Sequence, residues 1–324
     1  MPRLRWGLLS TARINRLIIP AIRAAARSEL TTVASRTLDR ARAYAAEWNI
    51  ARAHGSYEAL LDDPDVDVIY IGLPNSVHVE WTVRSLEAGK HVLCEKPLAL
   101  SVADIDRVQA ASTRASRAAA EAFMYRHHPL THAVEAIVKS GRLGIVRGLK
   151  GAFTFPLTRE GDVRLDPSLG GGSLWDVGCY PVSYACLLAG AAPVEVFGWQ
   201  HASPSGVDLE FAGMMRFADG CVAQFDSGFT GPLRAEMEIV GRDAALRIHR
   251  PFRTDDKSQL LLTSGDHTEA LPFEPEPPFA GEIADMEAAA LDGRPPRIPL
   301  SESRRTVQTI CALYESARTG LPQP

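Results

Sequence analysis

Residues 4–12, Leu-Arg-Trp-Gly-Leu-Leu-Ser-Thr-Ala, decide the fold, because a short apolar run leads directly into a turn of small residues. The run predicts a buried strand over residues 4–9. A turn that binds a dinucleotide needs little side chain where the backbone approaches the pyrophosphate, and a helix N-terminus behind it. Ser10 stands where a glycine is expected, and Ala12 is an accepted variant of the third glycine. An ordinary strand-to-helix turn is the alternative interpretation.

The helix after this turn would offer backbone N–H groups to a phosphate. Pro20 suits the first turn of a helix, which favours a helix that begins there after a short turn. The candidate cofactor ligands at this end of the chain are Gly7, Ser10, Thr11, Ala12, Arg13 and Ile14.

Outward from this turn, strand-like runs alternate with amphipathic helical segments. The alternation predicts an α/β Rossmann domain with a doubly wound parallel sheet, which we expect to bind a dinucleotide and to span residues 1–122. The expected strands are 4–9, 30–34, 66–73 and 91–95, and the expected helices are 36–48, 78–88 and 102–115.

From residue 123 the pattern changes to strand-like runs separated by short turns. The regular spacing of these runs predicts an antiparallel sheet. We expect residues 123–324 to form an α+β domain with a large, mainly antiparallel, open-faced sheet, which would bind substrate and form oligomers. Helices over 281–290 and 301–318 can pack back on the first domain. The apolar run 211–215 suggests that the outward face packs on a second subunit, as in a homodimer or homotetramer. The expected strands are 146–155, 195–200, 210–217, 221–229, 235–240 and 245–249, with a further helix over 180–188.

The composition disfavours several classes of protein. The chain has 324 residues, 46% hydrophobic and 23% charged, which is typical of a globular protein and sufficient for two domains. A net charge of −4 argues against nucleic acid and anionic membranes as partners, and no apolar run is long enough to span a membrane. Five widely spaced cysteines without a CxxC pair support neither disulfides nor a metal site, which favours a cytoplasmic location.

The end of the second predicted strand bears on the choice of cofactor. An acidic residue there would accept hydrogen bonds from the ribose hydroxyls of NAD, and none is present. Ser35 offers a hydroxyl and Arg36 a planar cation that suits a 2′-phosphate, so we expect NADP, with NAD as the alternative cofactor. Arg36 could instead start a solvated helix. Further candidate cofactor ligands follow the strand that ends at residue 73, and they are Leu73, Pro74, Asn75 and His78, although His78 could simply start a helix.

Glu95-Lys96-Pro97 ends the predicted strand 91–95, at the carboxyl edge where open α/β sheets bind their ligands. Lys96 is therefore expected where the chemistry occurs, with Glu95 beside it against the cofactor. Arg126, after the last strand of the first domain, is a further candidate cofactor ligand.

A second strong feature is the stretch 170–181, Gly-Gly-Gly-Ser-Leu-Trp-Asp-Val-Gly-Cys-Tyr-Pro. Its glycines permit a tight loop. If the following segment is helical, Asp176 and Tyr180 lie four residues apart on one face, where a carboxylate and a phenol can hold a hydroxyl and move its proton. Trp175 would form a wall of the substrate site. The alternatives are a helix cap for Asp176 and core packing for the two aromatic residues.

Together these motifs resemble the glucose–fructose oxidoreductase / inositol dehydrogenase family, often called the Gfo/Idh/MocA family. The chain looks most like its NADP-dependent sugar and dihydrodiol dehydrogenases, which pair the lysine with a tyrosine at the position of Tyr180. Ser10 in place of glycine is the clearest departure. The resemblance covers nearly the whole chain and rests on the Gly7 loop, Ser35-Arg36, 54–57, Pro74-Asn75 with His78, 88–97, 121–126 and the Asp176/Tyr180 segment.

The resemblance implies hydride transfer between NADP and the carbinol carbon of a sugar, polyol or diol. Tyr180 would be the acid/base, and Lys96 would assist because a nearby ammonium favours phenolate and stabilises charge on the substrate oxygen. Asp176 would orient a neighbouring hydroxyl, so Lys96, Asp176 and Tyr180 are the expected catalytic residues and, with Trp175, the expected substrate ligands.

Two other functions remain open at this point. One is a ketoreductase that acts on a nucleotide-linked deoxysugar with the same residues. The other is a non-catalytic, NADP-sensing regulator, which the presence of both Lys96 and Tyr180 disfavours.

Overall fold

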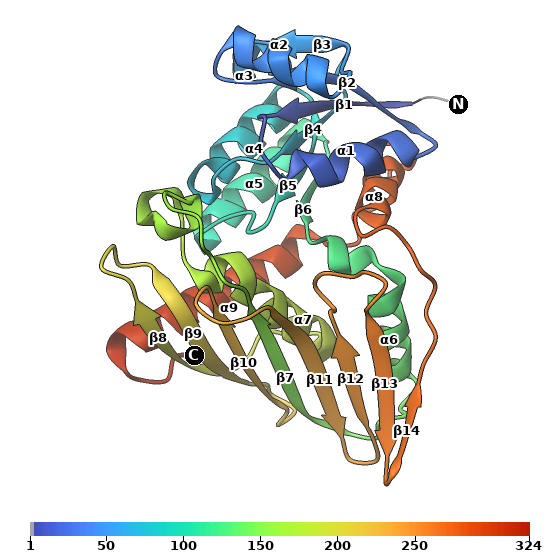
Figure 1. Ribbon diagram of the computed structural model, residues 1–324, viewed down its shortest axis with the longest axis vertical. Coiled ribbons are helices and arrows are strands. Elements are labelled where there is room, and N and C mark those ends of the chain that lie inside the picture. The colour runs from blue at the N-terminus through green and yellow to red at the C-terminus, as the bar shows by residue number, and fades with distance from the viewer. Residues whose placement is uncertain (1–2) are drawn as a thin grey trace. The chain divides into compact units, whose positions relative to one another are not determined.

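The opening apolar run forms strand β1 (Leu4–Leu9) of a six-stranded parallel sheet with the strand order β3-β2-β1-β4-β5-β6 (Figure 1). The computed structural model describes residues 3–324. The strand order reverses between β1 and β4, and open sheets of this kind bind ligands at such a switch point. The other strands are β2 (Ser28–Ala34), β3 (Arg52–His54), β4 (Val68–Ile71), β5 (His91–Glu95) and β6 (Ala119–Ala122).

Both faces of this sheet are covered by helices, because successive side chains of a strand point to opposite faces. On one face, Trp6 and Leu8 are fully buried in a core with Ile18, Ile22 and Ile283. These isoleucines belong to α1 (Asn15–Ala24) and α8 (Ala280–Asp292). The remaining helices of this unit are α2 (Leu38–Glu47), α3 (Tyr57–Leu61), α4 (His78–Glu87) and α5 (Val102–Ala115).

The predicted parallel sheet is confirmed, but the predicted start of the first helix at Pro20 is wrong. Helix α1 begins at Asn15 and contains Pro20. A proline inside a helix leaves the carbonyl four residues earlier without a partner. Pro20 and Arg16 both lie on the exposed side of α1, where water can solvate that carbonyl.

A second, eight-stranded sheet has the order β14-β13-β12-β11-β7-β10-β9-β8. Every neighbouring pair is antiparallel except β7 and β10, which confirms the predicted mainly antiparallel sheet. Its strands are β7 (Val146–Thr154), β8 (Glu195–Ala202), β9 (Asp208–Arg216), β10 (Val222–Gly228), β11 (Arg234–Gly241), β12 (Ala245–His249), β13 (Gln259–Ser264) and β14 (His267–Ala270).

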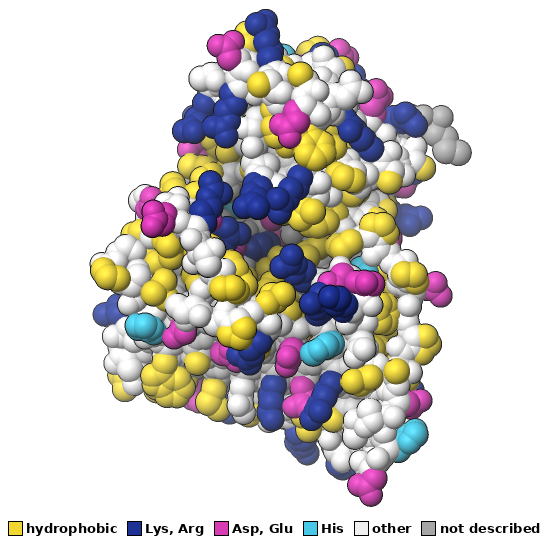
Figure 2. Space-filling view, viewed as in Figure 1, with side chains coloured by type: hydrophobic (Ala, Val, Ile, Leu, Met, Phe, Trp, Pro, Cys, Tyr) yellow, Lys and Arg dark blue, Asp and Glu magenta, His cyan; other side chains and the backbone are white. Residues whose placement is uncertain are grey.

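One face of this sheet packs on helices and the other is open (Figure 1). The helices are α6 (Pro129–Lys139), α7 (Cys179–Ala189) and α9 (Leu300–Thr319). In the run predicted to be apolar and outward, Phe211 and Met215 instead point inward, and only Ala212 and Met214 lie on the open face. Figure 2 shows Lys, Arg, Asp, Glu and His side chains mixed over this face. The prediction of a broadly apolar outward face is therefore corrected to a mixed one.

The chain forms two compact units, and each sheet belongs to one of them. Unit 1 comprises the described residues up to Met124 together with Phe279–Ser303, which include α8. Unit 2 comprises Tyr125–Pro278 and Arg304–Pro324. No helix within residues 3–324 is long and apolar enough to cross a membrane.

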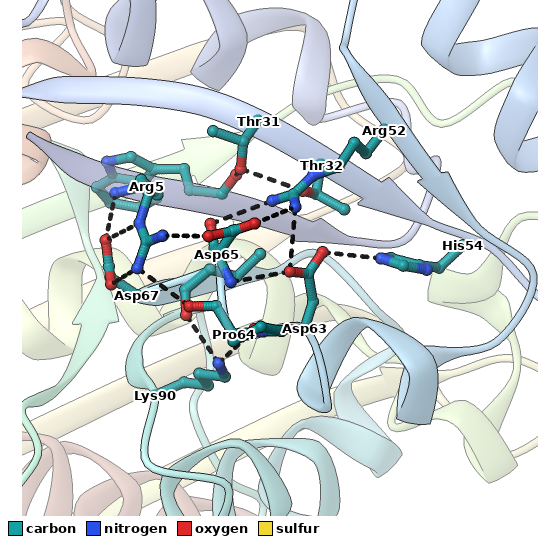
Figure 3. A network of polar contacts seen from close by, with 12 residues as sticks. Arg5, Thr31, Thr32, Arg52, His54, Asp63, Pro64, Asp65, Asp67 and Lys90 are labelled. Atoms are coloured by element: carbon teal, nitrogen blue, oxygen red, sulfur yellow. Dashed lines mark hydrogen bonds and ion pairs between the residues drawn. The ribbon is translucent and has the colours of Figure 1, made fainter.

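An ionic network ties together the amino ends of the strands in unit 1 (Figure 3). Arg5 of β1 binds Asp67, just before β4, with Nη2–Oδ1 and Nε–Oδ2 distances of 2.7 and 2.8 Å. Lys90, just before β5, donates to the carbonyl oxygens of Asp63 and Val66 at 2.6 and 2.8 Å. These contacts fix the strands at one edge of the sheet and leave the carboxyl edge to bind ligands.

Candidate active site

The turn after β1 is held by the side chain of Ser10. Its Oγ donates to the carbonyl oxygen of Gly72 at 2.9 Å and accepts from the backbone N–H of Ala12 at 3.2 Å. The side chain of Asn15, buried at the start of α1, donates to the carbonyl of Ser10 at 2.8 Å. Ser10 has a φ of 141°, in a region that residues with a Cβ rarely adopt. Its hydrogen bonds thus hold a conformation for which glycine is the usual choice.

Gly7, in contrast, serves the packing of the sheet. It lies inside β1, and a Cβ at this position would approach Leu60 of α3 to 2.9 Å. The structure therefore places Gly7 against α3, inside the strand that precedes the turn at Ser10.

The rest of this turn fits a pyrophosphate. Thr11 and Ala12 are partly exposed, and Arg13 is exposed. Helix α1 follows with no acidic residue in its first turn, so its N-terminal N–H groups and dipole favour an anion. Arg13 makes no ion pair within residues 3–324, which leaves its charge available.

The end of β2 and the helix α2 that follows it present two cations to the same region. Ser35 is buried, and its N–H donates to the carbonyl of His54 at 3.1 Å. Arg36 is exposed and forms no ion pair within the described part of the chain. Arg40 of α2, which the sequence interpretation missed, donates from Nε to Thr11 Oγ1 at 2.9 Å. Two guanidinium groups near the first turn fit the extra phosphate of NADP.

His78 lies between the segments that follow β4 and β5. Its ring is fully buried, with Nε2 2.8 Å from the carbonyl oxygen of Leu73 and Nδ1 2.8 Å from that of Pro97. Burial lowers the pKa of His78, although both carbonyls favour the protonated ring and the charge of Lys96 opposes it. The ring joins the segments that follow β4 and β5, and its burial leaves little surface for a direct contact with a cofactor.

The segment after β5 presents Glu95 and Lys96, both partly exposed, at the carboxyl edge of the sheet. Glu95 Oε1 accepts from the hydroxyl of Tyr70 at 2.5 Å, and Glu121 Oε1 accepts from the N–H of Leu98 at 2.9 Å. These bonds, together with His78, hold the backbone on both sides of Lys96. Leu73, Pro74 and Asn75 form the neighbouring exit from β4 and are also partly exposed.

Glu282 of α8 is a second carboxyl near Glu95. It is 1% exposed, and neither of its oxygens has a hydrogen-bond partner within residues 3–324. Burial raises the pKa of Glu282 well above its usual value, and the charges of Glu95 and Asp285 raise it further. Burial therefore favours the protonated, uncharged form of Glu282.

We expected Asp176 and Tyr180 to lie on one face of a regular helix. In unit 2, the stretch after the three glycines 170–172 does not form such a helix. Leu174–Gly178 is a π-helix, and α7 begins at Cys179. A π-turn holds an additional residue, so side chains four apart no longer stack as they do on an α-helix. Asp176 lies in the π-helix and Tyr180 in α7. Such turns are frequent at functional sites.

Asp176 is held by an arginine that the sequence interpretation missed. Arg164 Nε lies 2.6 Å from Asp176 Oδ2, and Arg164 Nη1 lies 3.2 Å from Asp162 Oδ1. Burial lowers the pKa of Arg164, but the two carboxylates outweigh this effect and raise it. One cation between two carboxylates leaves this cluster with a net negative charge. Arg164 lies in a single 3-10 turn (Val163–Leu165) without a recognisable motif, so nothing in the sequence marked it.

Tyr180 and Trp175 are largely buried, at 7% and 8% exposure. The phenol ring of Tyr180 packs against Tyr125, Phe153 and Phe252 at centroid distances of 5.2–5.7 Å. A phenol among aromatic rings sits in a medium of low dielectric constant, where a nearby charge acts strongly on it.

The remaining predicted ligand is Arg126, which belongs to unit 2 and is only 3% exposed. Little of its surface can meet a cofactor directly. Among residues 3–324, no group of three His, Cys, Asp or Glu side chains is placed to hold a metal ion.

Comparisons with known proteins agree with this architecture. Residues 4–123 match the model of the Gfo/Idh/MocA oxidoreductase family with an NAD-binding Rossmann fold, and residues 131–247 match a C-terminal domain model of the same family. The D-xylose 1-dehydrogenase (NADP(+)) 2 of Haloferax volcanii is 37% identical over 97% of this chain and 98% of that protein.

Two solved structures share the whole fold. A 3-ketoreductase from Actinomadura kijaniata, in complex with NADP and TDP-benzene, is 31% identical with a TM-score of 0.91, covering 97% of this chain and 98% of that one. An aldose–aldose oxidoreductase from Caulobacter crescentus, complexed with glycerol, is 26% identical with a TM-score of 0.92, covering 99% of both chains.

Proposed function

Because the chain belongs to the Gfo/Idh/MocA oxidoreductase family, we propose that it is an NADP-dependent dehydrogenase of a neutral sugar or related polyol or diol. The observation that carries this proposal is that Asp176, which Arg164 holds in place, lies on the same segment as the buried phenol of Tyr180. A phenol can take a hydroxyl proton, and a fixed carboxylate can hold the neighbouring hydroxyl of the same substrate.

Cofactor binding is assigned to unit 1. The turn at Ser10 and the N-terminus of α1 would hold the pyrophosphate, Arg36 and Arg40 the 2′-phosphate, and the segments at Asn75 and Lys96 the nicotinamide end. Bound NADP supplies a nicotinamide that accepts hydride in one direction and returns it in the other. The preference for NADP is also supported by the named cofactor of the Haloferax volcanii relative.

Proton transfer is assigned to Tyr180. In oxidation its phenolate oxygen takes the proton of the reacting hydroxyl, and in reduction the phenol returns it. The ammonium of Lys96 would favour the phenolate and stabilise negative charge on the substrate oxygen. Asp176, fixed by Arg164, would accept a hydrogen bond from an adjacent hydroxyl, and Trp175 would cover the apolar face of the ring.

The charge near Asp176 favours an uncharged substrate. Asp162, Arg164 and Asp176 together carry one positive and two negative charges, which suits hydroxyl donors and repels a diphosphate. The second candidate is a ketoreductase acting on a nucleotide-linked deoxysugar. It is favoured by the similarity to the ketoreductase solved with TDP-benzene.

One panel of substrates separates these functions. Purified protein would be assayed by NADPH absorbance with aldoses, polyols and dihydrodiols in the oxidative direction, and with nucleotide-linked keto sugars in the reductive direction. A higher kcat/KM for a neutral substrate than for the nucleotide-linked sugars supports the proposal. A higher kcat/KM for the nucleotide-linked sugars supports the second candidate. Tight NADPH binding without turnover on the whole panel would support a regulator and contradict both.

The open face of the second sheet is assigned to self-association as a homodimer or homotetramer. Trp199 and Met214 are 58% and 41% exposed there, among charged groups of both signs that can pair across a symmetric interface. Light scattering of the wild type and of Trp199→Glu tests this, because a charge buried in an interface should shift the mass toward the monomer. We assign the protein to the cytoplasm, since its five cysteines are all free thiols.

A further inference from the structure

Asp208, at the start of β9, is a buried carboxylate to which the proposed reaction gives no role. It is 2% exposed, and burial raises its pKa although its hydrogen bonds oppose the shift. Oδ2 accepts from Ser173 Oγ at 2.7 Å and from the N–H of Leu174 at 2.8 Å. Oδ1 accepts from the hydroxyl of Tyr314 at 2.6 Å. Three donors from two other parts of unit 2 therefore meet on one side chain.

The first two donors lie where the π-helix of Trp175 and Asp176 begins. The N–H groups in the first turn of a helix have no partner within the helix. Asp208 accepts one of them from a neighbouring strand and so fixes where the helix starts. Gly172 allows this approach, because it has a φ of 126° and a Cβ there would lie 2.3 Å from Asp208 Oδ1.

The third donor connects this point to the predicted substrate wall. The ring of Tyr314, on α9, lies 5.7 Å from the ring of Trp175, centroid to centroid. Its other neighbour is Phe211 of β9, at 5.5 Å. The Asp208 bond thus sets the position of the ring on which Trp175 rests.

We propose that Asp208 and Tyr314 are positioning residues, which set the start and the side-chain placement of the segment from Trp175 to Tyr180. The inference rests on the proposed function, because that function gives Trp175, Asp176 and Tyr180 their roles. A misplacement of about 1 Å in such a segment costs on the order of 100-fold in rate. Neither residue needs to touch substrate or cofactor to have this effect.

Three variants distinguish positioning from simple structural support. Asp208→Ala removes all three acceptor contacts, whereas Tyr314→Phe removes one bond and keeps the ring against Trp175. Asp208→Asn is the matched control, because its amide oxygen can accept from Ser173 and Leu174 and its amide nitrogen can donate to the hydroxyl of Tyr314.

Turnover per NADPH-binding site is the first readout, since it counts only folded molecules. We expect Asp208→Ala and Tyr314→Phe to lower kcat by about tenfold or more with the Kd of NADPH unchanged, and Asp208→Asn to recover most of the loss. Unchanged kcat per binding site in Tyr314→Phe and in any folded Asp208→Ala would overturn the inference. If Asp208→Ala does not fold, the comparison of kcat per binding site between Tyr314→Phe and Asp208→Asn tests the inference.

Hydrogen exchange of amides 172–180 is the second readout and needs no substrate. Faster exchange of this segment in Tyr314→Phe than in Asp208→Asn supports the inference, and equal protection in all variants contradicts it. If the wild type turned over no substrate of the panel, the proposed function would fail, while the exchange data would still judge the positioning role of Asp208.

Discussion

The hydroxyl of Ser10 donates to the carbonyl oxygen of Gly72 over 2.9 Å, and this bond joins the turn after β1 to the end of β4. The two strands flank the switch point of the parallel sheet. A residue with a Cβ at a φ of 141° costs about 1–3 kcal/mol relative to a relaxed backbone. The side-chain bonds of Ser10 offset this cost, so a serine holds the turn where glycine is the family's usual choice.

Ser10→Ala should be harmful and Ser10→Gly harmless. Alanine keeps the strained backbone and loses the bonds to Gly72 and Ala12, so we expect a loss of about 1–3 kcal/mol in the free energy of unfolding and weaker NADPH binding. Glycine loses the same bonds but relieves the strain. Urea unfolding and titration of NADPH fluorescence measure both effects. Equal affinities of the wild type and Ser10→Ala would contradict this role for the hydroxyl.

His78 should make the protein sensitive to mild acid. Its pKa in the folded state is lowered from 6.5 by burial, so the unfolded chain binds a proton more readily than the folded one. Stability from this group is present above pH 6.5 and is lost as the pH falls below that value. His78→Gln, which can still donate one hydrogen bond, should unfold with a weaker pH dependence in this range. The same slope in both proteins would contradict the assignment.

Glu282 should have the opposite dependence on pH. Its folded-state pKa is raised well above 4.5, so the folded chain keeps a proton that the unfolded chain releases. Stability is then lost as the pH rises from 4.5 toward the folded-state pKa, by up to about 1.4 kcal/mol per pH unit.

Glu282→Gln removes this titration while keeping the size of the side chain. We expect the free energy of unfolding of the variant to increase relative to that of the wild type as the pH rises. Urea unfolding across a pH series measures the difference. A constant difference from acidic to mildly alkaline pH would show that Glu282 is charged in the folded protein.

The fold could be predicted from sequence where local pattern and tertiary structure agree. Strands β1 and β5 and helix α5 occur over the residues predicted for them, because the two strands are short apolar runs and α5 is amphipathic with Ser101 as its N-cap. The start of helix α1 was predicted at Pro20, because proline favours the first turn of a helix. In the structure Pro20 is exposed and is tolerated inside the helix, which begins at Asn15.

The parts of the site that escaped prediction depend on contacts between residues distant in sequence. Asp208 meets Ser173 and Tyr314 only through the pairing of strands and the return of α9, and no local pattern encodes that meeting. The start of the π-helix at Asp176 also meets a distant residue, since the carboxylate that accepts from the N–H of Leu174 lies on β9. Family motifs mark the reacting groups, whereas their supports appear only in the folded chain.

The central claim is that Tyr180 and Lys96 act together on a carbinol, and one set of rate measurements tests it most directly. Wild type, Tyr180→Phe, Lys96→Ala and the double variant would be compared on the accepted sugar, with the Kd of NADPH measured in parallel. Tyr180→Phe keeps the ring that packs on Tyr125 and Phe153, so we expect this variant to fold like the wild type. A lower rate then reports the loss of the hydroxyl. We predict a loss in kcat of about 100-fold or more for each single variant, little further loss in the double variant, and an unchanged Kd. Near-full turnover by both single variants would contradict the claim.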